Sequence, residues 1–230
     1  MSESHYAATG LLVLDRVTPM IAALFGEFNL KANCPGKGRA GISLTPGRSF
    51  PCWENIHFNL FVLGAHLRIL PDREETPDPQ TILSAWAGYF HVERDAVLQS
   101  WIERHPIRDT ADLSSLFLLA TRFDDGHKLT AIAFEGCWHS RAPRLFGYGG
   151  DACYHSREFV WFNESSQVLF LGNELSSALR KGNTGHASTV VITEILRLLD
   201  GIQDEAARAK VRQYVAGFLT DYPAVKDVPI

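Results

Sequence analysis

The stretches Cys137-Trp-His139 and Cys153-Tyr-His155 decide how the middle of this 230-residue chain folds. Both lie in segments with the residue alternation of β-strands. If the two segments pair as an antiparallel hairpin, one register places Cys137 opposite His155. The same register places His139 opposite Cys153. The sequence therefore predicts a hairpin that carries two cross-strand Cys/His pairs on one face.

Charged residues on either side of these pairs favour the same register. It places Glu135 opposite Arg157, and Arg141 opposite Asp151. Opposite charges that face each other across two strands stabilise a pairing, and a slip by one residue would move every side chain to the other face. The hairpin register is therefore predicted from four pairs rather than from two.

This hairpin extends into a three-stranded meander in the prediction. Asp125-Gly126 is a typical two-residue hairpin turn, and it lies between apolar segments at 115–123 and 128–141. A third strand is expected at 151–162. The meander is the element from which the rest of the fold prediction is built.

Helix signals surround the predicted meander. Thr18 and Asp78 each precede a proline, which is the typical pattern of an N-cap followed by the first helical residue. Further amphipathic helices are expected at 93–104, 167–180, 189–200 and 204–219, and a strand at 56–62. The predicted fold class is α+β: a mainly antiparallel sheet with a central three-stranded meander, packed by helices, with a C-terminal helical hairpin. We expect a single domain over 1–230, with a weak subdivision near 182–187 into a sheet-containing body (1–182) and a helical hairpin (187–230).

The composition narrows the class of protein. The chain is 46% hydrophobic and 21% charged, which favours a folded core over disorder. A net charge of -4 does not favour nucleic acid or an anionic membrane as partner. The four cysteines suit a reducing compartment better than a disulfide scaffold, and we find no signal peptide or membrane span. A cytoplasmic location is the expectation.

We call the two cross-strand Cys/His pairs the Cys/His ladder. Its chemistry allows three interpretations. Zinc prefers two thiolates and two imidazoles, so Cys137, His139, Cys153 and His155 form a candidate metal site. On a pleated sheet, however, one ion reaches two or three of them more easily than all four. Alternatively, Cys153 with His139 would form a thiolate–imidazolium pair for nucleophilic catalysis. The third interpretation is that all four side chains only pack the sheet. No cofactor other than zinc is indicated.

The loop after the first hairpin strand is the candidate contact surface. Arg141, Arg144, Phe146 and Tyr148 lie there among glycines. Arginine with exposed aromatics anchors protein interfaces and also grips single-stranded nucleic acid. The acidic net charge favours a protein partner, with nucleic acid as the second choice.

These observations lead to one functional expectation. We expect an intracellular, non-catalytic binding or regulatory protein that acts through the outer hairpin and its loop, residues 135–157. Its candidate binding residues are Glu135, Arg141, Arg144, Phe146, Tyr148 and Arg157. The first alternative is a Cys/His-dependent enzyme or zinc-site protein that uses the four ladder residues, and the second is a nucleic-acid-binding module.

Overall fold

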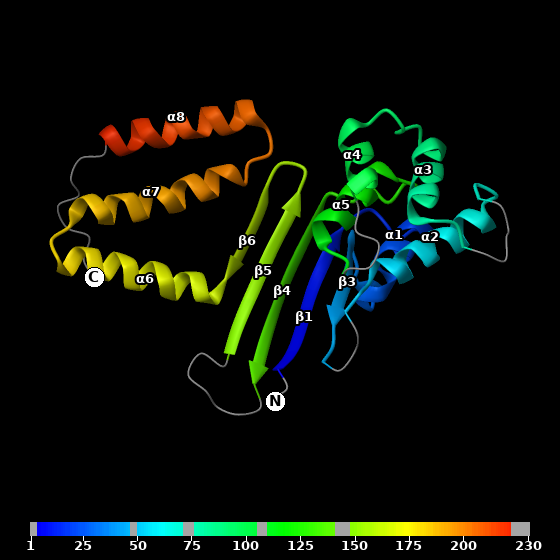
Figure 1. The fold of residues 1–230 in the computed structure, drawn as a ribbon, viewed down its shortest axis with the longest axis horizontal. Helices are drawn as coiled ribbons and strands as arrows, with labels where there is room; N and C mark the ends of the chain where they lie inside the picture. The colour runs from blue at the N-terminus through cyan, green and yellow to red at the C-terminus, as the bar shows by residue number, and fades with distance from the viewer. Residues whose placement is uncertain (1–3, 47–49, 71–75, 105–109, 141–147, 222–230) are drawn as a thin grey trace. The chain divides into compact units, whose positions relative to one another are not determined.

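The computed structural model describes residues 4–46, 50–70, 76–104, 110–140 and 148–221. Its strands are β1 (Ser4–Val13), β2 (Lys31–Pro35), β3 (Arg39–Leu44), β4 (Ala131–Ser140), β5 (Tyr148–Ser156) and β6 (Val160–Glu164). Its helices are α1 (Pro19–Phe25), the short 3-10 helix η1 (Gly26–Phe28), α2 (Trp53–His66), α3 (Pro79–Tyr89), α4 (Ala96–Arg104), α5 (Leu113–Arg122), α6 (Ser165–Arg180), α7 (Thr184–Asp200) and α8 (Glu205–Asp221). The predicted α+β fold class is confirmed (Figure 1).

The six strands form one antiparallel sheet in the order β2-β3-β1-β4-β5-β6 (Figure 1). The N-terminal strand β1 is central, because it pairs with β3 on one side and with β4 on the other. Gly10 lies opposite Ile42 in β3 and opposite Phe134 in β4. A β-carbon at Gly10 would lie 2.6 Å from both the Ala133 carbonyl oxygen and the Phe134 ring, so only glycine fits there.

One face of β1, β3 and β4 carries the core of the first unit. Leu12, Ile42 and Ile132 alternate inward along these strands and are almost completely buried. They join one hydrophobic cluster with side chains from α1 to α5, among them Trp53 and Trp86. The helices α1 to α5 therefore cover this face of the sheet.

The two predicted helix starts are confirmed with their capping bonds. The backbone N–H of Ile21 donates to Thr18 Oγ1 at 3.4 Å, and that of Thr81 donates to Asp78 Oδ1 at 2.9 Å. In both helices proline occupies the first turn. These side chains satisfy backbone donors that have no partner inside the helix.

The first strand of the predicted meander is wrong. Residues 115–123 fall almost entirely within helix α5, whose N-cap Asp112 accepts a hydrogen bond from the N–H of Ser115 at 2.8 Å. Leu116 and Leu119 are fully buried and share one helical face. Residues 56–62, also predicted as a strand, lie within α2.

The structure contains a meander, but it is built from β4, β5 and β6. Asp125-Gly126 joins α5 to β4 instead of closing a hairpin. The predicted third strand at 151–162 is divided by a turn, in which the Ser156 hydroxyl accepts hydrogen bonds from the N–H groups of Glu158 (3.2 Å) and Phe159 (3.0 Å). The turn gives two strands where the sequence predicts one.

Two compact units make up the chain, residues 1–155 and 156–230. In the second unit α7 packs against both α6 and α8 (Figure 1). The start of β6 is tied to the α7–α8 connection, because the N–H of Val160 donates to the Gly201 carbonyl at 2.8 Å. Likewise the N–H of Gln203 donates to the Glu158 carbonyl at 2.9 Å. The predicted single domain, with its weak subdivision near 182–187, stays a prediction.

Candidate binding surface on the β4–β5 hairpin

The outer part of β4 and β5 has two faces with different chemistry. Along β4, Ile132 and Phe134 belong to the core face, so Glu135 and Cys137 point to the opposite side. Along β5, the ring of His155 lies 6.1 Å from the ring of Phe117 in α5, which places it on the core face. We call the side that carries Glu135 and Cys137 the open face, and the other side the covered face.

The covered face holds a polar and aromatic cluster. The hydroxyl of Tyr6 in β1 donates to the Asp151 carboxylate, with oxygen–oxygen distances of 2.9 and 3.2 Å. The Tyr6 ring stacks with that of Trp138 at a centroid distance of 6.5 Å. Burial, then the hydrogen bond to Asp151, raises the pKa of Tyr6 well above its ordinary value. The cluster therefore joins β1, β4 and β5 at this end of the sheet.

Two glycines make room for the cluster. A β-carbon at Gly149 would lie 2.3 Å from the Trp138 ring. A β-carbon at Gly136 would lie 2.1 Å from the Tyr6 hydroxyl oxygen. A β-carbon at Gly150 would lie 3.2 Å from the Gly136 carbonyl oxygen, so Gly136 and Gly150 are neighbours across the two strands.

This neighbourhood corrects the predicted register. The predicted pairing of Cys137 with His155 would place Gly136 opposite Ser156, whereas a β-carbon at Gly136 would lie 2.7 Å from Asp151 Oδ1. The close packing of Trp138 on Gly149 selects the shifted register. Arg157 then lies beyond the end of β5, in the turn before β6, and not opposite Glu135.

The described ladder residues do not gather into a metal site. Cys153 and His155 lie on the covered face, and Cys137 lies on the open face. Among the described side chains, these three do not bring their ligand atoms within 4.8 Å of one another. The side chain of His139 is outside the described residues, and its part in the prediction stays a prediction.

The environment of Cys153 disfavours a thiolate. Burial, and secondarily the charge of Asp151, raises the pKa of the Cys153 thiol to about 11. Burial also lowers the pKa of His155, whose Nε2 lies 3.0 Å from the hydroxyl oxygen of Ser114. A nucleophilic cysteine needs the opposite environment, with a lowered pKa and a nearby cation.

Slow alkylation of Cys153 is the expected result. Because its thiolate fraction near neutral pH is small, we expect iodoacetamide to react with it about tenfold more slowly than with a free cysteine peptide. Because the pKa of the Cys153 thiol is about 11, the rate should keep rising up to about pH 11, whereas a thiol with the ordinary pKa of 9.0 levels off earlier. Peptide-resolved mass spectrometry measures the rate, with the exposed Cys137 as internal control. Faster labelling of Cys153 than of Cys137 near neutral pH would contradict this account and support the catalytic alternative.

The open face presents two exposed tyrosines. Tyr148 is 66% exposed and Tyr154 is 43% exposed, both on β5. Glu135 and Cys137 on the neighbouring strand are also exposed. Of the other predicted binding residues, Arg157 is exposed in the turn after β5, while Arg141, Arg144 and Phe146 lie outside the described residues.

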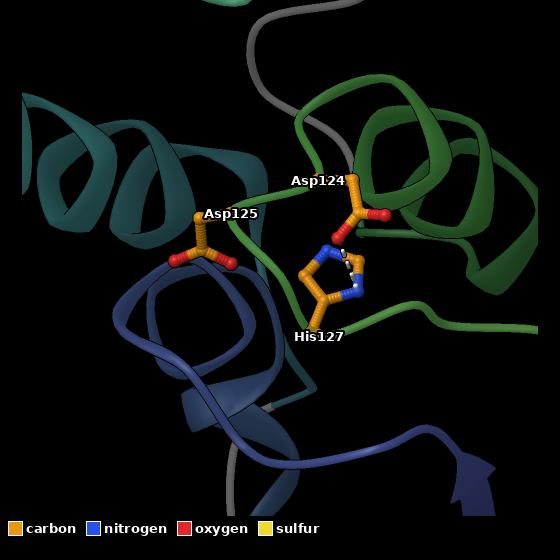
Figure 2. A group of neighbouring side chains, drawn as sticks. All are labelled: Asp124, Asp125 and His127. Carbon is orange, nitrogen blue, oxygen red and sulfur yellow. Dashed lines mark ion pairs between the residues drawn. The ribbon is translucent and has the colours of Figure 1, made fainter.

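A second cluster of potential ligands lies between α5 and β4 (Figure 2). Single oxygen or nitrogen atoms of Asp124, Asp125 and His127 lie within 4.8 Å of one another. No site is predicted here from the sequence, because Asp124-Asp125 is typical of a turn; the signal that could have revealed the cluster is a histidine two residues after the acidic pair. Figure 2 shows the imidazole of His127 pointing toward Asp124, with Asp125 on the other side of the loop.

Hydrogen bonds explain this cluster as a structural junction. His127 Nδ1 accepts the N–H of Leu129 at 2.9 Å, so its lone pair is not free for a metal. Asp124 Oδ1 accepts backbone N–H groups of the turn, and although burial alone would raise the pKa of Asp124, these bonds lower it overall. Asp125 accepts the N–H of Met20 in α1 at 3.1 Å. Asp125 thus links the α5–β4 connection to the start of α1, while Asp124 and His127 bond within the connection.

No protein-family model matches the chain. Searches of curated proteins and of solved structures also gave no significant match. Among the described residues, no helix has the length and apolar character needed to cross a membrane.

Proposed function

We propose that the protein is a non-catalytic binding protein whose partner is another protein. The proposed surface is the outer hairpin, residues 135–157, with the open face of β5 at its centre. The observation that carries the proposal is the exposure of Tyr148 (66%) and Tyr154 (43%) on that face. Tyrosine supplies a large, amphipathic contact area at low entropic cost, which is why it is enriched at protein interfaces.

The contacts on the covered face of the hairpin support this proposal. The Tyr6–Asp151 hydrogen bonds and the Trp138 stack hold the covered face in place, so the strand that presents the tyrosines is preorganised. Preorganisation lowers the entropic cost of association. The net charge of -4 favours a protein over a nucleic acid. Arg141, Arg144 and Phe146 belong to the proposed surface as predicted residues.

The raised pKa of Cys153 argues for binding rather than covalent chemistry on this hairpin. A thiol that remains protonated near neutral pH is a poor nucleophile. Regulation of a partner by contact is therefore the form of activity that we propose.

A photocrosslinking amino acid at Tyr148 tests the proposal in the cells that make the protein. We expect a discrete crosslinked product between the chain and one other protein. The matched control is the same amino acid at Tyr89 in α3, which is 51% exposed but lies on a helix of the first unit. The control should give no discrete product.

Three outcomes would contradict the proposal. Equal labelling from positions 148 and 89, or none from either, would remove the surface as a specific binding site. A product that disappears on nuclease treatment would favour the nucleic-acid alternative. A product of the chain with itself would assign the hairpin to self-association.

A further inference from the structure

The second unit buries very little of its own apolar surface. In the described residues from 156 onward, the buried apolar side chains are only Ala178, Ala187 and Leu199. Twelve large apolar side chains of α6, α7 and α8 are exposed by 39–69%: Val168, Leu169, Phe170, Leu179, Val191, Ile192, Leu196, Leu198, Val211, Tyr214, Phe218 and Leu219. We call these twelve the helical apolar surface. Small domains with so little core are marginal by themselves.

Several charged side chains of these helices already have partners within the unit. Arg197 donates to the Gln167 side chain at 2.6 Å and to the Phe162 carbonyl at 3.0 Å. His186 pairs with Glu174 at 3.2 Å. What the helical apolar surface offers a partner is therefore chiefly hydrophobic contact.

The apolar side of helix α8 is the least covered by the rest of the second unit. It has 17 residues, and its apolar positions Val211, Tyr214, Val215 and Phe218 share one side by helical spacing. Only Val215 among these is half-buried, while Tyr214 is 69% and Phe218 is 65% exposed. Most of the stability of a helix in a protein comes from packing of its apolar side, and this side of α8 is largely uncovered.

We propose that a second copy of this chain covers the helical apolar surface, so that α6, α7 and α8 of two chains form one shared core. The summed exposed apolar area of the twelve side chains is on the order of 1,000 Å², and a standard interface needs about 800 Å² from each partner. Because consecutive residues such as Val168, Leu169 and Phe170 point to different sides of α6, this area is spread over more than one side of the helices, and a core shared between the helices of two chains would bury more of it than one flat contact. Obligate homodimer interfaces resemble a domain core cut in half, which is what this unit presents. A two-fold arrangement also places apolar surface against identical apolar surface without complementary charges.

This inference is independent of the proposed function, because it concerns other elements of the chain. The two can fail separately: the crosslink from Tyr148 reports on β5, and the oligomeric state reports on α6 to α8.

Sedimentation velocity of the intact chain between about 0.1 and 50 µM tests the shared core. We expect a discrete species of two chains. The double variant Tyr214→Asp, Phe218→Asp should raise the dimer dissociation constant at least about a hundredfold, since it places two charges in an apolar interface. The control Ala209→Asp, Gln213→Asp adds the same charge on the opposite side of α8 and should leave the dimer intact.

Hydrogen exchange of the α8 amides distinguishes a variant that has lost the dimer from a variant that has unfolded. In the wild type, the α8 amides should be protected at high concentration and lose protection on dilution. A chain that is monomeric throughout this range would overturn the proposal, whether its α8 is protected or not. Open-ended aggregates in place of a dimer would also overturn it, as would a monomer that instead sediments with lipid vesicles.

Discussion

Replacing Trp86 with alanine should lower the free energy of unfolding by about 3–5 kcal/mol. Trp86 is 1% exposed and stacks on Phe90 at a centroid distance of 5.9 Å. Its ring also lies 6.5 Å from that of Phe123, at the end of α5. The loss should come from the cavity and not from the helix, because alanine is the best helix former. Urea unfolding followed by circular dichroism measures the change.

The neighbouring Tyr89 supplies a matched control. It belongs to the same helix and touches the Trp86 ring edge-on at 5.8 Å, but it is 51% exposed. Tyr89→Ala should therefore cost no more than about 1 kcal/mol. If the two variants were destabilised equally, α3 would not pack as described.

Replacing Gly136 with valine should lower the free energy of unfolding by about 2–4 kcal/mol. The new β-carbon would meet the Tyr6 hydroxyl at 2.1 Å and Asp151 Oδ1 at 2.7 Å. Tyr6 must move, and its hydrogen bonds to Asp151 would be lost. The same unfolding measurement applies.

Two further variants separate the clash from a general strand effect. Cys137→Val places the same side chain one position along β4 on the open face, where it should change stability by less than about 1 kcal/mol. In a Tyr6→Ala background, Gly136→Val should cost at least about 1 kcal/mol less, because the space is then empty. A full cost in that background would mean that Tyr6 does not lie over Gly136.

The helices with local end signals were predictable, and those without them were not. Thr18 and Asp78 cap α1 and α3 as the sequence indicates. Helix α2 begins after Cys52, which makes no side-chain capping bond, and its β-prone residues over 56–62 suggested a strand. One side of α2 is buried against the other helices of the first unit, and this burial outweighs the local preference for a strand.

Helix α5 was missed because a strong turn motif competed with its cap. Asp125-Gly126 is typical of a hairpin, so the apolar run before it was assigned as a strand. In the structure Gly126 has a φ of 98°, and the same motif closes the turn after the helix. Asp112, the N-cap of α5, was the signal that could have corrected the prediction.

The hairpin itself was predictable, but its register and faces were not. Alternation in β4 and β5 is visible in the sequence. The register, however, depends on Tyr6 from the distant strand β1, which bonds Asp151 and stacks on Trp138. Pairwise charge matching within the hairpin cannot reveal a third strand. Tyr148, a predicted binding residue, is 66% exposed, and its binding role stays a prediction.

We propose that this chain acts by surface contact, including contact with a second copy of itself, in place of the metal-site and reactive-thiol alternatives. Native mass spectrometry of the purified full chain beside its denatured mass tests this most directly. We predict a species with twice the mass of the chain and no bound metal, and its loss in the Tyr214→Asp, Phe218→Asp variant. A single-chain species, or a chain that retains zinc and loses it in Cys153→Ala, would contradict the account.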